Sequence, residues 1–95
     1  MWLWTTMGRQ GDRTVTIRGQ RWRLRFVPNL GEDMGQCDYN LRVIRVALGQ
    51  SQEDELDTVV HELLHAAYPD TEETAIGETA EAIAKVLLRL GWRKT

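Results

Sequence analysis

The chain has 95 residues, which allows a single domain with a compact core. Hydrophobic residues make up 42% and charged residues 27%, as is ordinary for a globular protein, and the single cysteine excludes a disulfide within the chain. The net charge of -2 hides an asymmetry, because residues 1–48 are rich in arginine and residues 49–95 in acids.

We expect residues 1–12 to be a loose leader. They include Trp2 and Trp4, which could cover an apolar patch or join two chains into an oligomer. The segment lacks the basic start and long apolar run of a signal peptide, and no run approaches the roughly 20 apolar residues of a membrane-spanning helix. We therefore expect a cytoplasmic protein without a membrane partner.

Residues 13–48 have the alternating pattern of β-strands. Two runs alternate around a turn near Gly19, and a third follows at residues 41–48. The second run alternates three apolar residues with three basic ones: Trp22, Leu24 and Phe26 with Arg21, Arg23 and Arg25. The segment 29–40 is rich in turn-forming residues and predicts a loop.

The second half of the chain changes to helical spacing. Ser51 is a good N-cap, and apolar residues then recur every three or four positions until Pro69. Asp70 or Thr71 is expected to cap a second helix. We therefore predict helices over residues 51–68 and 71–90.

These elements predict the α+β class. The expected fold is a small three-stranded antiparallel sheet packed on two C-terminal helices, in the order β-β-β-α-α and as one domain. The first of the two helices carries the residues that indicate chemistry.

That helix contains the segment His61-Glu62-Leu63-Leu64-His65, which holds the only two histidines of the chain. Positions i and i+4 lie on one helix face, so both imidazoles can bind one ion. Glu62 is rotated from His61 by about 100° and can reach a water on that ion without being a ligand. The pattern predicts one zinc ion per chain, with Glu62 as the general base.

A catalytic zinc needs a third protein ligand and one open position. Glu73 falls on the buried stripe of the second helix, and the turn before it would bring it back to His65. It is our first candidate, although a role limited to the helix dipole is nearly as good an interpretation. The alternatives are Glu78, followed by Glu72 and Glu81. Cys37 could also bind the metal, but a metal-free thiol is the favoured interpretation.

The segment from Leu56 to Ala66 resembles the active-site helix of zincin metallopeptidases. The following segment, Glu72 to Leu87, is similar to the glutamate helix of gluzincins, and the closest likeness is to small phage-type relatives of ImmA/IrrE-type peptidases. The resemblance implies that His61, His65 and a glutamate of the second helix bind zinc, with Glu62 as the base.

The resemblance also implies an edge strand that binds an extended substrate by backbone pairing. Our candidates for the rim of such a cleft are Gly35, Gln36, Cys37 and Asp38. The phenol of Tyr68, close after His65, could help to stabilise an oxyanion, although packing under the inter-helix turn is the favoured interpretation.

The predicted function is therefore a zinc-dependent metallopeptidase that acts on a protein or peptide. One alternative is a zinc-stabilised binding or regulatory module that does not cleave. The other is a nucleic-acid-binding protein that uses the arginines of the second strand, although a solvated or ion-paired sheet face is the favoured interpretation of these arginines.

Overall fold

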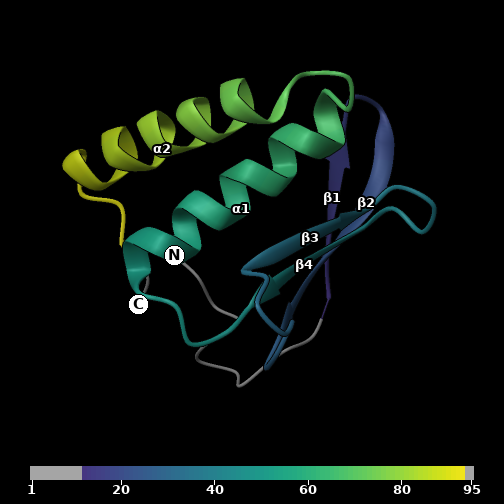
Figure 1. The fold of residues 1–95 in the computed structure, drawn as a ribbon, viewed down its shortest axis with the longest axis horizontal. Helices are drawn as coiled ribbons and strands as arrows, with labels where there is room; N and C mark the ends of the chain where they lie inside the picture. Colours follow the sequence, from purple (N-terminus) through teal and green to yellow (C-terminus); the bar gives the residue numbers. More distant parts are fainter. Residues whose placement is uncertain (1–11, 94–95) are drawn as a thin grey trace.

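The computed structural model describes residues 12–93. Four strands precede two helices along this part of the chain (Figure 1). The elements are β1 Arg13–Ile17, β2 Gln20–Val27, β3 Gly35–Asp38, β4 Val43–Ala47, α1 Gln52–Ala67 and α2 Glu73–Arg89. Residues 1–11, with Trp2 and Trp4, lie outside the described residues, so the predicted leader and its role in an oligomer stay predictions.

The sheet differs from the prediction of three antiparallel strands. It has four strands in the order β1-β2-β4-β3, and β2 pairs with β4 in parallel. The additional strand, β3, lies in the segment predicted to be a loop. Its four residues show no alternation of apolar and polar side chains, so no local pattern predicts a strand here. The strand forms by pairing with β4.

The mixed topology follows from the path of the chain. After β2, the chain crosses to the far edge of the sheet, forms β3, and returns through β4, which lies between β2 and β3. The connection between the parallel strands therefore contains a strand and no helix. Such a return cannot be read from the spacing of the apolar residues.

One face of the sheet carries the core. Trp22, Leu24 and Phe26 of β2 lie on the same face as Ile44 and Val46 of β4, since Leu24 is paired with Ile44 and Phe26 with Val46. Phe26, Ile44 and Val46 are fully buried, and Val59 of α1 packs against this cluster. The predicted inward face of β2 is thus the face on which α1 lies.

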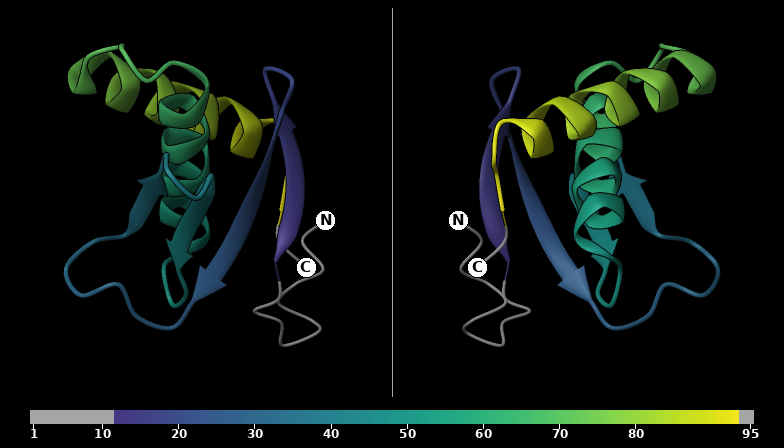
Figure 2. Two further views of the ribbon diagram at one scale, coloured as in Figure 1. Left: turned by 90° about the vertical axis from the view of Figure 1, so that its right-hand side faces the viewer. Right: turned by 90° about the vertical axis from the view of Figure 1, so that its left-hand side faces the viewer.

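Only α1 packs on the sheet, and α2 packs on α1. In Figure 1, α1 lies between α2 and the strands, and Figure 2 shows α2 crossing α1 at a steep angle. No Cα atom of α2 comes within 8 Å of a strand residue. The prediction that both helices pack on the sheet is therefore wrong. The buried stripe of α2, formed by Ile76, Ala80 and Ala84, packs on α1.

The helix ends agree with the sequence at α1 and differ at α2. Ser51 caps α1, and its hydroxyl accepts a hydrogen bond of 3.1 Å from the Asp54 N–H. At α2 the N-cap is Glu72, which makes no side-chain cap, so neither Asp70 nor Thr71 caps this helix. The N–H of Thr71 instead donates to the Tyr68 carbonyl in the turn between the helices. No helix of the described residues is long and apolar enough to cross a membrane.

Candidate metal centre

Helix α1 brings the two histidines together. His61 and His65 are one turn apart, with ring centroids separated by 4.9 Å and Nε2 atoms by 3.2 Å. The opposite side of the helix is anchored by buried Leu56 and Val59. Because that side is fixed against its neighbours, the imidazoles are held on the open side of α1.

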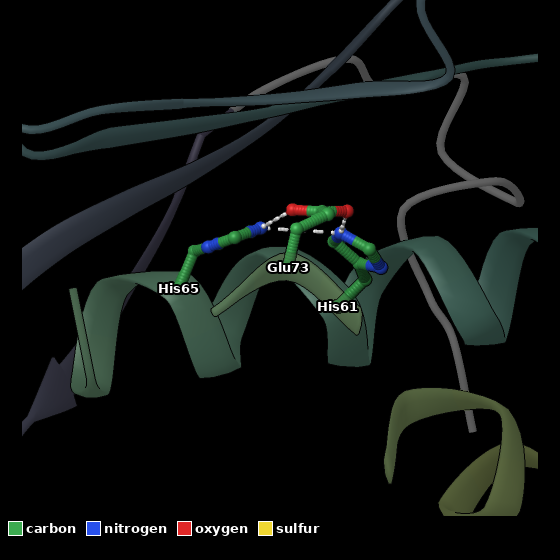
Figure 3. A group of neighbouring side chains, drawn as sticks. All are labelled: His61, His65 and Glu73. Atoms are coloured by element: carbon green, nitrogen blue, oxygen red, sulfur yellow. Dashed lines mark hydrogen bonds and ion pairs between the residues drawn. The ribbon is translucent and has the colours of Figure 1, made fainter. Parts of the chain in front are cut away.

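Glu73, the first residue of α2, completes the group. Its Oε2 lies 2.9 Å from His61 Nε2, and its Oε1 lies 2.8 Å from His65 Nε2. Figure 3 shows the three side chains pointing toward one another from two helices. The helix phase predicts a buried Glu73, whereas its side chain is 68% exposed, because it faces the open side of α1 and not the helix interface.

His61, His65 and Glu73 form a candidate metal-binding group, which could hold a divalent ion. One donor atom from each of His61, His65 and Glu73 can be chosen so that all three lie within 4.8 Å of one another. Two nitrogens that bind one tetrahedral zinc at about 2.0–2.1 Å would be about 3.3 Å apart, close to the observed 3.2 Å. Two imidazoles and a carboxylate are also a donor set that zinc takes in catalytic sites.

Glu62 lies beside this group and is not part of it. The residue is 8% exposed, and burial raises the pKa of its carboxyl; His61 and His65 oppose this shift, whereas Glu73 raises the pKa further. The backbone of Gly35 in β3 covers Glu62 closely: a β-carbon on Gly35 would be 2.9 Å from Glu62 Cγ and 3.0 Å from Oε2. Glu62 is thus held between α1 and the edge strand.

A cleft of about 710 Å³ opens between α1 and β3, and the candidate metal-binding group lies in its wall. Of the predicted rim, Gly35, Gln36 and Cys37 line this cleft. Asp38 does not line it; it borders an adjoining hollow, which shares Gln36, Cys37 and Tyr39 with the cleft, and its carboxylate lies 3.7 Å from Arg45 of β4.

Cys37 lies in the cleft but outside the metal-binding group. Burial raises the pKa of its thiol to about 11, against a smaller opposing effect of a hydrogen bond with Tyr39. The interpretation of Cys37 as a metal-free thiol stays a prediction.

The tyrosine of the cleft is Tyr39, and not Tyr68. Tyr68 is 51% exposed, and the guanidinium of Arg18 stacks 5.2 Å from its ring centroid. Tyr39 lines the cleft and donates a hydrogen bond of 3.0 Å to the His65 carbonyl. Tyr39 lies just after β3, which sequence reasoning missed, so its proximity to His65 was hidden as well.

The other candidate carboxylates lie elsewhere. Glu72, Glu78 and Glu81 are outside the metal-binding group, and Glu81 pairs with Lys85 at 3.1 Å. Sequence reasoning also missed two acids of the cleft wall, Asp54 and Asp57. Asp57 is four residues before His61, so helical spacing alone could have placed it on the same face.

Comparisons of the chain with protein-family models, with curated proteins and with solved structures found no match. The interpretation of the site therefore rests on its own geometry.

Proposed function

We propose that the protein is a zinc-dependent metallopeptidase. The observation that carries this proposal is the convergence of His61, His65 and Glu73 from two helices, with 3.2 Å between the two Nε2 atoms. Within residues 12–93, no fourth His, Cys, Asp or Glu joins this group. Three ligands leave a coordination position for water, which is typical of catalytic rather than structural zinc.

Zinc bound here would lower the pKa of a coordinated water and polarise a substrate carbonyl. Glu62 is the group of the chain that would accept the proton of this water, because its carboxylate lines the same cleft without belonging to the ligands. The oxygen of this water, with its second proton, would become part of the new carboxylic acid as the C–N bond breaks. Glu62 then returns the proton to the leaving amine, so one water is consumed for each bond cleaved.

The free edge of β3 supports a peptide substrate. Among the described residues, β3 pairs only with β4. The Ala47 N–H donates to the Met34 carbonyl, and hydrogen-bonded pairs alternate along an antiparallel ladder. The peptide groups of Gly35 and Cys37 therefore face outward, where an extended peptide can pair with them above the cleft.

The two alternatives have less support. A zinc-stabilised module without activity does not explain why an acidic residue that is not a ligand, Glu62, is buried beside the metal-binding group. For nucleic-acid binding, the arginine face of the sheet carries its own counter-charges: Asp12 forms a bidentate pair with Arg25, and Asp38 lies near Arg45. A cytoplasmic location is part of the same proposal, because the one cysteine forms no disulfide within the chain.

Zinc content tests the metal site directly. Elemental analysis of the purified protein is expected to give one zinc per chain, lost in His61→Ala and His65→Ala and weakened in Glu73→Ala. Glu78→Ala is the matched control, because Glu78 is an exposed carboxylate of the same helix outside the group. Absence of zinc from the wild type after metal-supplemented purification would overturn the proposal.

Catalysis needs a second experiment. A library of peptides from a digested proteome would be incubated with zinc-loaded protein, and new termini identified by mass spectrometry. Wild type is expected to produce cleavages that Glu62→Gln does not, while the variant keeps its zinc. Cleavage by both proteins would point to a contaminating protease, and cleavage by neither would leave a binding module.

A further inference from the structure

The cleft extends beyond the metal-binding group toward the start of α1, and this extension has a distinct charge. Of the residues that the structure describes, four acidic ones line the cleft, namely Asp54, Asp57, Glu62 and Glu73, and no lysine or arginine does. An adjoining hollow shares Met34, Gln50 and Asp54 with the cleft and adds Glu32 and Asp33, and no basic residue between positions 12 and 93 lines it. The acidic lining thus continues from the metal-binding group past the start of α1 to the loop that holds Glu32 and Asp33.

Bound zinc would not compensate this charge. A divalent ion balances the two carboxylates next to it, those of Glu62 and Glu73, and leaves Asp54 and Asp57 without a counter-charge. Neither aspartate forms an ion pair with a residue of the described part of the chain. Burial raises the pKa of Asp57, and although His61 opposes this shift, Glu81, Asp54 and Glu53 raise it further.

A peptide lying in the cleft would cover these two aspartates. Covering an uncompensated carboxylate with neutral groups costs free energy, because the carboxylate loses water and gains no partner. A lysine or arginine side chain replaces the lost water with a charge-assisted hydrogen bond. The electrostatics of the wall therefore favour a cationic side chain at this end of the cleft.

The distances fit a residue close to the scissile bond. With a rise of about 1.5 Å per helical residue, Asp57 lies about 6 Å and Asp54 about 10 Å before His61 along α1. An extended peptide advances about 3.3 Å per residue, so these aspartates lie two or three residues from the metal. Gly35 of the edge strand lies over Thr58 and Glu62, which keeps the peptide directly above this wall.

We propose that the cleft selects extended peptides with a lysine or arginine within about three residues of the scissile bond, held by Asp54 and Asp57. This inference rests on the proposed peptidase site for its metal and edge strand. It adds the substrate class, which the ligands alone do not determine. In antiparallel pairing with β3, the cationic residue follows the scissile bond; in parallel pairing, it precedes it.

Binding to an inactive protein tests the selection without requiring cleavage. The probes are fluorescein-labelled alanine-based peptides of equal length that carry either lysines or glutamates, titrated into zinc-loaded Glu62→Gln and followed by fluorescence anisotropy. We expect the lysine peptide to bind about tenfold more tightly than the glutamate peptide at low salt, with the ratio falling as salt is added.

The ratio is then measured in two further backgrounds. Adding Asp54→Asn and Asp57→Asn is expected to remove most of the preference for the lysine peptide. The control adds Asp70→Asn and Glu78→Gln, which remove the same charge from exposed positions outside the cleft. This control is expected to keep the preference. Circular dichroism and zinc content establish that each variant is folded.

Two outcomes overturn the inference: equal binding of both peptides to Glu62→Gln, or an unchanged ratio after the two cleft aspartates are replaced. If the preference is present but the wild type cleaves no peptide, the selection stands and the peptidase proposal fails. The two proposals can therefore fail separately.

Discussion

Gly35 of the edge strand lies against Glu62 so closely that a β-carbon on Gly35 would be 2.9 Å from Glu62 Cγ. The same β-carbon would be 2.6 Å from Thr58 Cγ2. Glycine at this position therefore lets β3 approach α1 and place its outward peptide groups directly above the proposed base. A glycine in a strand often marks such a close approach.

Gly35→Ala is expected to lower the free energy of unfolding by about 1–3 kcal/mol, because the new methyl group overlaps the γ-carbons of Thr58 and Glu62. Chemical denaturation measures the loss, and zinc content should be unchanged, since none of the three atoms nearest to that β-carbon belongs to His61, His65 or Glu73. If the wild type cleaves a peptide, Gly35→Ala should cleave it more slowly even under conditions in which the variant is fully folded, because the new methyl group displaces Glu62.

Gly77→Ala is the matched control within α2. A β-carbon there would be 3.9 Å from His61 Cε1, an ordinary contact, and alanine stabilises a helix interior relative to glycine by about 1 kcal/mol. We expect this variant to be more stable than the wild type. Destabilisation by both glycine substitutions would contradict the role given to the close approach at Gly35.

Tyr39→Phe tests the tyrosine beside the metal-binding group. The variant loses the hydrogen bond to the His65 carbonyl and should be less stable by about 0.5–1.5 kcal/mol, while the ring keeps its edge contact with Trp22. Tyr68→Phe keeps the ring that stacks with Arg18 and should change stability by less than about 0.5 kcal/mol. Equal losses in thermal or urea unfolding would be inconsistent with this difference.

The thiol of Cys37 should react slowly at neutral pH. Burial raises its pKa from 9.0 to about 11, so below pH 9 the folded protein holds about one hundredth of the thiolate of an ordinary cysteine. Alkylation by iodoacetamide, followed by mass spectrometry, should accelerate as pH rises toward this value. In urea the rate at pH 8 should be far higher; equal rates in folded and unfolded protein would exclude the raised pKa.

Zinc should stabilise the fold if the proposed site is correct. A ligand that binds only the folded state at one hundred times its Kd adds about 2.7 kcal/mol, and for a domain of this size that corresponds to about 10–20 °C in Tm. Calorimetry with zinc and after treatment with a chelator measures the shift. His61→Ala should show no shift, and an equal shift in that variant would place the stabilising ion elsewhere.

Local patterns sufficed to predict the two helices and the position of the histidines. The period of apolar residues places His61 and His65 on one face, and the phase of the second helix singled out Glu73, which lies 2.8 Å from His65. The exposure of Glu73 did not follow from that phase. It depends on where the first turn of α2 meets α1, which is a tertiary relationship.

The sheet was the less predictable half. β3 has only four residues, and their sequence carries no alternation that would predict a strand. They form one by pairing with β4. Because β3 was expected to be a loop, the sequence offered no reason to place Tyr39 in the cleft, whereas the resemblance already suggested Gly35 for the cleft rim. The parallel pairing of β2 and β4 likewise depends on a long-range return of the chain.

The position of β4 has a consequence for the order in which the molecule can be assembled during synthesis. Both of its neighbours come earlier in the chain, so a nascent polypeptide that ends before Val43 has the β1–β2 hairpin but nothing to join β3 to it. The edge proposed to receive the substrate is therefore completed only when the last strand enters the middle of the sheet. The helix with both histidines begins at Gln52, five residues after that strand ends, and Glu73 begins the next helix, so the edge leaves the ribosome before the three candidate ligands do.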